Sequence, residues 1–129
     1  MLQAKLELEV KNNQGTWDAL DFIVDPGTEM TTMQASRARK LDLPIPKRPV
    51  RGLVLNGQEV RRGLLRARIP GLDPTEYIFP CYFLGDPNVP IRDPKNLLGL
   101  TGVIDKIRLI FDGTPSGAAQ YGLLIVEKI

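Results

Sequence analysis

The sequence predicts a mainly β domain whose antiparallel strands form a closed or nearly closed barrel, with one or two short helices beside it. Three observations predict this fold. Short apolar segments recur along the chain, turn residues separate them at close intervals, and few segments have helical spacing. The length of 129 residues, with 43% hydrophobic and 25% charged residues, predicts one domain over 1–129 with a single core.

The N-terminal part of the chain predicts two strands joined by a turn. Residues 2–10 alternate charged and apolar side chains, which is the pattern of a half-buried strand. A turn at 12–15 follows, and residues 17–24 predict a second strand. Because its last residues, Phe22-Ile23-Val24, form a continuous apolar run, we expect this end of the strand to be buried on both sides.

The middle of the chain predicts a short helix and a hairpin. Residues 34–41 carry apolar side chains at helical spacing, and Pro44 stops the chain soon afterwards. In residues 50–60, apolar segments flank Asn56-Gly57, a strong hairpin signal because both residues tolerate the positive φ of a type I′ turn.

The remaining segments predict short strands separated by turns and prolines. Residues 85–95 contain three prolines and predict a loop, and the apolar segment 96–100 predicts a strand that passes into a short helix. The other predicted strands are 63–70, 76–84, 106–112 and 123–129, with a turn-rich segment at 113–122 before the last.

Residue types that are absent exclude several kinds of chemistry. The chain has no histidine, so Ser-His-Asp triads, Cys-His pairs and the usual zinc ligand sets are excluded. It also lacks the GxxxxGK[ST] and GxGxxG motifs of nucleotide-binding loops. Cys81 is the single cysteine and is predicted to be a small buried thiol. We therefore expect no metal and no cofactor, and an enzyme would have to use carboxylates, lysine or tyrosine.

No apolar run approaches the roughly 18 residues of a membrane span. The N-terminal residues alternate in polarity, unlike the apolar segment of a signal peptide. The sequence therefore predicts a cytoplasmic protein without a membrane partner.

The tripeptide Asp25-Pro26-Gly27 allows two interpretations. These residue types favour an ordinary tight turn. However, the tripeptide directly follows the apolar end of a strand and precedes a hydroxyl-rich stretch with Thr28, Thr31 and Thr32. A carboxylate delivered by a buried strand needs partners or a function, so an active-site loop is the alternative.

A second segment, Leu97-Leu98-Gly99, lies about seventy residues further along the chain and by itself predicts core packing around a glycine bend. The combined order of features resembles the retropepsin-like aspartic proteases. Their subunit carries one hydrophobic-hydrophobic-Asp-Thr/Ser-Gly loop and one later hydrophobic-hydrophobic-Gly segment. The similarity is to DNA-damage-inducible retropepsin-like domains and their bacterial relatives, and it covers most of residues 17–113.

The resemblance implies a closed acid-protease barrel and an aspartic endopeptidase. In this family two carboxylates share one proton and activate a water molecule. Since this chain has one such loop, the resemblance implies a homodimer in which each Asp25 faces its counterpart across a two-fold axis. Gly27 would let the two loops approach closely, and Thr28 would donate a hydrogen bond to the carboxylate.

The resemblance also implies that the substrate is an extended peptide, bound as an added β-strand. The hairpin around Leu55, Asn56 and Gly57 would be the flap that closes over it, with a plain structural hairpin as the alternative. The terminal strands 2–10 and 123–129 have the family's position for an intersubunit sheet.

Pro26 departs from the family pattern. The family's threonine or serine at this position makes reciprocal hydrogen bonds that lock the two loops together, and proline has neither the hydroxyl nor the N–H. Thr101 is a second departure, because close relatives often have aspartate there. The alternative function is therefore a catalytically weakened module for peptide binding or dimerisation.

The chain contains one strongly basic segment. Between residues 37 and 68 there are ten basic and two acidic residues, a net charge of +8, whereas the whole chain has +2. A solvated basic face explains this pattern, and preference for acidic peptides is the alternative. Nucleic acid is an unlikely partner because the chain has few aromatic residues and no nucleic-acid-binding motif. The basic residues are Arg37, Arg39, Lys40, Lys47, Arg48, Arg51, Arg61, Arg62, Arg66 and Arg68.

Overall fold

The computed structural model describes residues 4–72, 74–92, 94–115 and 122–129. These residues form nine strands and one short helix, which confirms the prediction of a mainly β fold. In chain order the elements are β1 (Ala4–Lys11), β2 (Trp17–Val24), β3 (Thr31–Gln34), α1 (Ala35–Lys40), β4 (Val54–Leu55), β5 (Gln58–Arg68), β6 (Tyr77–Leu84), β7 (Leu97–Leu98), β8 (Ile107–Pro115) and β9 (Gly122–Lys128).

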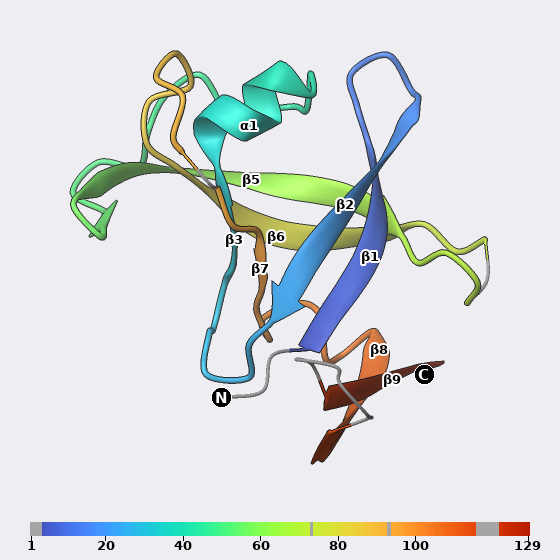
Figure 1. Cartoon of the computed structure of the whole chain (residues 1–129). Coiled ribbons are helices and arrows are strands. Elements are labelled where there is room, and N and C mark those ends of the chain that lie inside the picture. Colours follow the sequence, from blue (N-terminus) through green and yellow to red (C-terminus); the bar gives the residue numbers. More distant parts are fainter. Residues whose placement is uncertain (1–3, 73, 93, 116–121) are drawn as a thin grey trace.

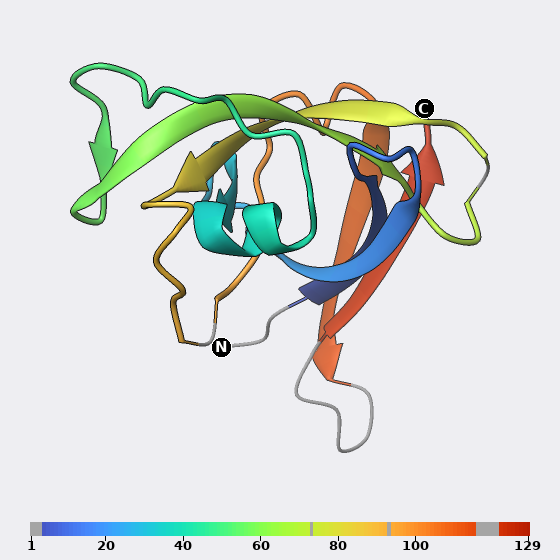
Figure 2. The ribbon, with the colours of Figure 1, turned by 90° about the horizontal axis from the view of Figure 1, so that it is seen from above.

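Most strands belong to one curved sheet that closes on itself (Figure 1). The strand order is β1-β2-β7-β3-β6-β5-β4, and an additional pairing of β1 with β5 completes the ring. β4 pairs with β5 outside this ring, while β8 and β9 form a separate two-stranded sheet that lies beside β1 (Figure 2). The predicted closed barrel is therefore confirmed.

The core fills the inside of the ring with alternate side chains of the strands. Leu8, Phe22, Met33, Phe83 and Leu98 come from five different strands and are fully buried. Each buried side chain of this size stabilises the fold by about 1.5–3 kcal/mol, and in the longer strands these side chains alternate with outward-facing ones.

Within the described residues the first two strands form where they were predicted, and residues 2 and 3 of the first prediction lie outside that part of the chain. One detail of burial differs. Phe22 and Val24 are buried, but Ile23 between them is only half-buried. The strand therefore alternates, and the prediction of burial on both faces was wrong for Ile23. β2 has a neighbouring strand on each side, β1 and β7. This central position in the sheet is consistent with the continuous apolar run at residues 22–24.

The terminal strands are paired within the chain. β1 runs antiparallel to β2 over its full length, and its last residues also pair with β5. β9 pairs with β8 along nearly its whole length. An intersubunit sheet made by these two strands remains a prediction, and it would have to use edges that these pairings leave open.

The middle of the chain contains the largest differences from the predicted elements. The predicted hairpin strand and the separate strand 63–70 form one continuous strand, β5. Gly63, predicted as the first residue of the second strand, lies inside β5, where a β-carbon would be 2.8 Å from the ring of Phe83. β3 was not predicted, because a four-residue strand is too short to show a period.

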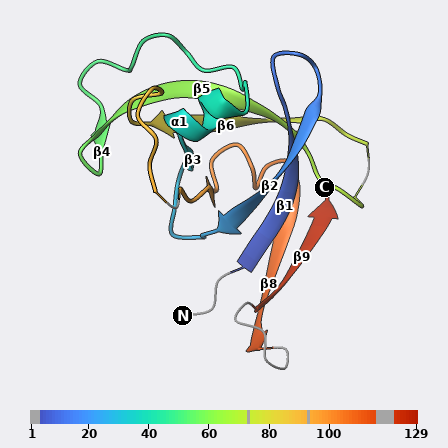
Figure 3. The same ribbon diagram turned by 45° about the horizontal axis from the view of Figure 1, so that its top comes forward.

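The helix α1 follows β3 directly and lies at one end of the ring, near the end of β6 (Figure 3). It is six residues long and buries Ala35 and Ala38, as the helical spacing predicted. The short helix predicted to follow the segment 96–100 is absent, because residues 101–106 form consecutive turns, and the strand predicted from residue 106 begins at Ile107.

Within the described residues, no helix has the length and apolar character needed to cross a membrane. Residues 116–121 of the predicted turn-rich segment lie outside the described residues, and β8 extends to Pro115. Cys81 is fully buried and unpaired, as predicted, and burial raises the pKa of its thiol.

Candidate active-site loop

The loop between β2 and β3 holds the Asp25 carboxylate by hydrogen bonds from its own residues. The backbone N–H of Gly27 donates to Oδ1 at 2.9 Å, and the hydroxyl of Thr28 donates to Oδ2 at 3.0 Å. The N–H of Thr28 also donates to the carbonyl of Asp25 at 3.0 Å, which closes a tight turn. The segment is therefore a turn, as its residue types predict, and this turn also orients a carboxylate.

The tip of this loop is open to solvent in the single chain. Asp25 and Thr28 are half-buried, whereas Pro26 and Gly27 are exposed. Burial on one side fixes the carboxylate, and exposure on the other leaves it accessible to another molecule.

Strand β7 brings the two sequence motifs together. It runs parallel to the end of β2, with Ile23 paired to Leu97 and Val24 paired to Leu98. The N–H of Asp25 then points to the carbonyl of Leu98 at 3.4 Å. Residues that are about seventy positions apart in the sequence are thus neighbours at the base of the loop.

Gly99 fits against the loop so closely that a side chain has no space. A β-carbon at this position would be 2.4 Å from the carbonyl carbon of Met30 and 2.6 Å from the carbonyl oxygen of Glu29. The backbone can approach this closely only because the residue is glycine.

Three further hydrogen bonds fasten the residues after β7 to the residues after Asp25. The N–H of Gly99 donates to the fully buried hydroxyl of Thr31 at 3.1 Å. The N–H groups of Leu100 and Thr101 donate to the carbonyls of Thr28 and Glu29, at 3.1 and 2.8 Å. Both ends of the loop are therefore held by the backbone of residues 98–101, and its tip at Pro26 and Gly27 stays free of these bonds.

Two residues that contribute to this arrangement were missing from the predicted site. Thr31 was noted only as part of a hydroxyl-rich stretch, although it is the buried acceptor for Gly99. Asn96 is buried before β7, where its carbonyl accepts from the N–H of Ile23 and its side chain donates to the carbonyl of Asp21. The sequence signal that could have indicated Asn96 is its position, as a polar residue directly before the apolar pair Leu97-Leu98.

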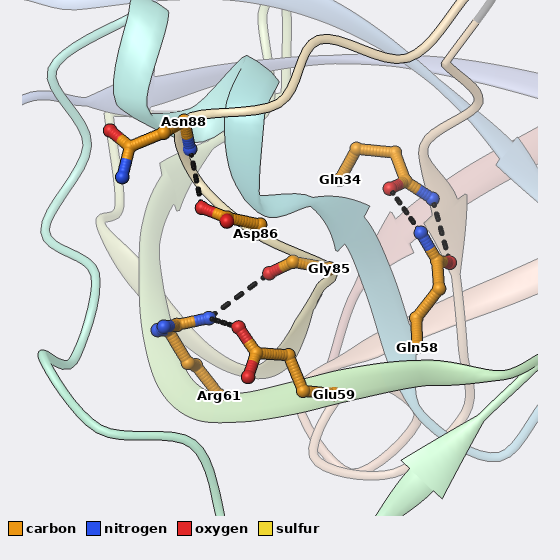
Figure 4. A network of polar contacts seen from close by, with 7 residues as sticks. All are labelled: Gln34, Gln58, Glu59, Arg61, Gly85, Asp86 and Asn88. Atoms are coloured by element: carbon orange, nitrogen blue, oxygen red, sulfur yellow. Dashed lines mark hydrogen bonds and ion pairs between the residues drawn. The ribbon is translucent and has the colours of Figure 1, made fainter.

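The predicted flap residues form a hairpin tip that lies apart from the Asp25 loop. Asn56 and Gly57 have φ values of 51° and 74°, as a type I′ turn requires, and Leu55 ends β4. Figure 1 shows the hairpin at the far end of β5, away from the β2–β3 loop. Reciprocal amide hydrogen bonds between Gln34 and Gln58 anchor its base (Figure 4).

The described residues contain no cluster of three or more Asp, Glu, His or Cys side chains that could bind a metal. The chemistry that this loop offers is thus that of one oriented carboxylate. A single carboxylate can accept or donate a proton, and a second one is needed to do both at the same time.

Comparison with known proteins identifies a similar fold by structure and no family by sequence. No protein-family model matches the chain, and no curated protein matches its sequence. A solved structure of a retropepsin-like aspartic protease from Rickettsia conorii has a similar fold, with a TM-score of 0.53 over 98% of this chain and 95% of that chain. The two sequences are 14% identical, so this likeness concerns the fold alone. The chain has a retropepsin-like fold.

Proposed function

We propose that this protein is an aspartic endopeptidase that acts as a homodimer, with Asp25 of each copy as its catalytic residue. The observation that carries the proposal is the junction between the Asp25 loop and Leu97-Leu98-Gly99. Two motifs far apart in the sequence meet there and hold one carboxylate in a fixed orientation. The retropepsin-like fold supports the same conclusion.

The dimer is part of the proposal because one chain supplies one such carboxylate. The exposure of Pro26 and Gly27 at the loop tip leaves room for the same loop of a second copy. Two carboxylates placed this close share one proton, because both cannot ionise.

In the proposed reaction, the ionised carboxylate accepts a proton from water while the protonated one donates its proton to the carbonyl oxygen of the peptide. The water oxygen bonds to the carbonyl carbon. The carboxyl group that took the proton from water then donates it to the amide nitrogen, and one hydroxyl of the tetrahedral intermediate returns a proton to the other carboxylate. The C–N bond breaks, and a carboxylic acid and an amine leave. The Gly27 N–H and Thr28 hydroxyl would keep each Asp25 oriented through both steps.

Pro26 favours a second candidate, a peptide-binding or dimerisation module with little or no turnover. Proline cannot donate a backbone hydrogen bond and has no hydroxyl, so it cannot make the reciprocal bonds with which the family locks its loops. The loss of several bonds of about 1 kcal/mol each would weaken the pairing of the loops.

The test compares Asp25→Asn with the matched control Asp21→Asn. Asp21 is an exposed aspartate on β2, the strand that precedes the loop. In a peptide-library cleavage assay at acidic to neutral pH, Asp25→Asn should lower the rate by about 10²–10⁴-fold. Asp21→Asn should stay within about twofold of the wild type, and an aspartic protease inhibitor that mimics the transition state should abolish cleavage.

Two results would contradict the proposal. Residual cleavage by Asp25→Asn above a tenth of the wild-type rate would assign the activity to another group. Sedimentation as a monomer at micromolar concentration would remove the second carboxylate. Peptide binding by a dimer without turnover would favour the second candidate.

A further inference from the structure

The basic segment 37–68 separates into two parts in the structure. On β5, Arg61 pairs with Glu59 at 2.7 Å, Arg66 pairs with Glu76 at 2.9 Å, and Arg68 pairs with Glu9 at 3.0 Å. The basic residues of 37–51 have no ion pair with any described residue. These residues are Arg37, Arg39, Lys40, Lys47, Arg48 and Arg51. Arg62 on β5 contacts the ring of Tyr82 and likewise has no ion pair with a described residue. The segment's other cations without an ion pair lie on α1 and in the residues that follow it.

A groove runs between α1 and the proline-rich loop that follows β6, and we call it the α1 groove. It has a volume of about 600 Å³, with Arg37, Arg39 and Lys40 on the helix side. Its other side includes the apolar residues Pro90 and Ile91. No acidic residue lines it among those that the structure describes.

The acidic residues Glu59, Asp86 and Asp42 belong to neighbouring segments and do not line the α1 groove. Asp86 accepts from the N–H of Asn88 at 2.8 Å, and Glu59 binds Arg61, which also donates to the carbonyl of Gly85 (Figure 4). Asp42 accepts from the side chain of Asn13 at 3.0 Å. Arg61 neutralises Glu59, whereas Asp86 and Asp42 keep their negative charges because their partners are neutral. Neither aspartate lines the α1 groove, so its described lining has three cations and no carboxylate and presents a positive potential.

We propose that the α1 groove is a docking site for an extended protein segment in which acidic and apolar side chains alternate. An extended chain directs successive side chains to opposite sides, so one set meets the cations of α1 and the other meets Pro90 and Ile91. The groove lacks what single-stranded nucleic acid requires, because no aromatic residue for base stacking is among its described lining residues.

The docking site is distinct from the proposed active site. Asp25 does not line the groove, and α1 lies at the opposite end of the barrel from the β2–β3 loop (Figure 1). Docking goes beyond the proposed peptidase function and does not depend on it. If both hold, the groove recruits protein substrates by a sequence remote from the bond that is cut.

The test measures binding directly, with the full chain carrying Asp25→Asn so that the probe stays intact. The probe is a fluorescein-labelled ten-residue peptide in which glutamate alternates with valine, and the readout is fluorescence anisotropy. We expect saturable binding that weakens as salt rises from about 0.05 to 0.15 M. The same peptide with glutamine in place of glutamate should bind at least about tenfold more weakly.

Two double variants with equal changes in charge locate the site. Arg39→Glu/Lys40→Glu reverses two exposed cations that line the groove, and Arg48→Glu/Arg51→Glu reverses two exposed cations that do not. The first should weaken binding at least about tenfold, because two attractions become two repulsions, and the second by less than about threefold. Arg39→Gln/Lys40→Gln removes the two charges without reversing them and should cause an intermediate loss of binding affinity. Circular dichroism of each variant would show whether it is still folded.

Several outcomes would overturn the proposal. Equal losses in the two charge-reversal variants would indicate diffuse attraction without a site. Equal binding of the glutamine peptide, or absence of binding at millimolar peptide, would also contradict it. Tighter binding of a ten-nucleotide single-stranded DNA would assign the surface to nucleic acid. Cleavage plays no part in this binding measurement. A negative result would therefore overturn the docking proposal and leave the peptidase proposal unaffected.

Discussion

Two positions in this molecule require glycine for different reasons, one in the hairpin turn and one beside the Asp25 loop. Gly57, at the hairpin tip, has a φ of 74° and nothing within 4 Å of its missing β-carbon. Gly99, beside the Asp25 loop, has no positive φ, but a β-carbon there would be 2.4 Å from the backbone of Met30. The first glycine is needed for its backbone angle and the second for its absence of volume.

The difference reflects how the two regions are built. The hairpin turn is specified by two adjacent residues, Asn56 and Gly57, whose own conformations determine it. The Asp25 loop is held by hydrogen bonds from residues 98–101, which come from a distant part of the sequence. Changes at the loop should therefore lower the stability of the whole fold strongly, and changes at the hairpin should lower it less.

The largest effect should come from Gly99→Ala. The added methyl group meets the backbone of Glu29 and Met30 rather than a flexible side chain, so the loop and β7 must separate. We expect a loss of about 3 kcal/mol or more in the free energy of unfolding. Urea denaturation at fixed protein concentration would measure this loss, and a cost below about 1 kcal/mol would show that the junction can relax.

A smaller effect should follow from Thr31→Val, which keeps the shape of the side chain and removes the acceptor for the Gly99 N–H. A buried donor left without a partner costs about 1–3 kcal/mol. Thr32→Val is the matched control, since Thr32 is the half-buried next residue on the same strand. Urea denaturation should show a cost below about 0.5 kcal/mol for the control, and equal costs would contradict the assigned role of Thr31.

The same contrast explains what could be predicted from the sequence. The Asn56-Gly57 turn, the strands β1 and β2, and the helix α1 depend on local residue types and on periods within one segment, so their positions were predicted to within a few residues. β3 and the continuity of β5 depend on their neighbours in the sheet. The sequence places the start of a strand at Gly63, whereas in the sheet β5 continues through Gly63, whose missing β-carbon leaves space for the ring of Phe83.

The candidate site was predicted only in part for the same reason. The Asp25 loop and Leu97-Leu98-Gly99 were recognised by the order of motifs along the chain. The roles of Thr31 and Asn96 were missed, because each acts on backbone groups that only the folded chain brings near. Hydrogen bonds between distant backbone groups leave no local pattern in a sequence.

Pro26→Thr tests the exposed tip of the same loop. Threonine restores a hydroxyl and an N–H where the proposed dimer would join its loops, so the dimer should tighten by about 2 kcal/mol, or roughly thirtyfold in dissociation constant. Sedimentation over a range of concentrations measures the affinity, and the cleavage rate should rise with it. Pro70→Thr, at another exposed proline, controls for the general effect of losing a proline. No gain in affinity or rate would show that Pro26 does not limit the pairing of the loops.

The smallest effect should come from Gly57, where the two kinds of glycine can be separated. Gly57→Ala should cost about 1 kcal/mol, because alanine must adopt a left-handed conformation although space is available. Gly57→Asn should cost about half as much or less, since asparagine tolerates that conformation. At Gly99 the order should reverse, with asparagine at least as damaging as alanine, because volume and not the backbone angle is limiting. Urea denaturation of the four variants measures these costs, and the same order at both positions would show that one property governs both glycines.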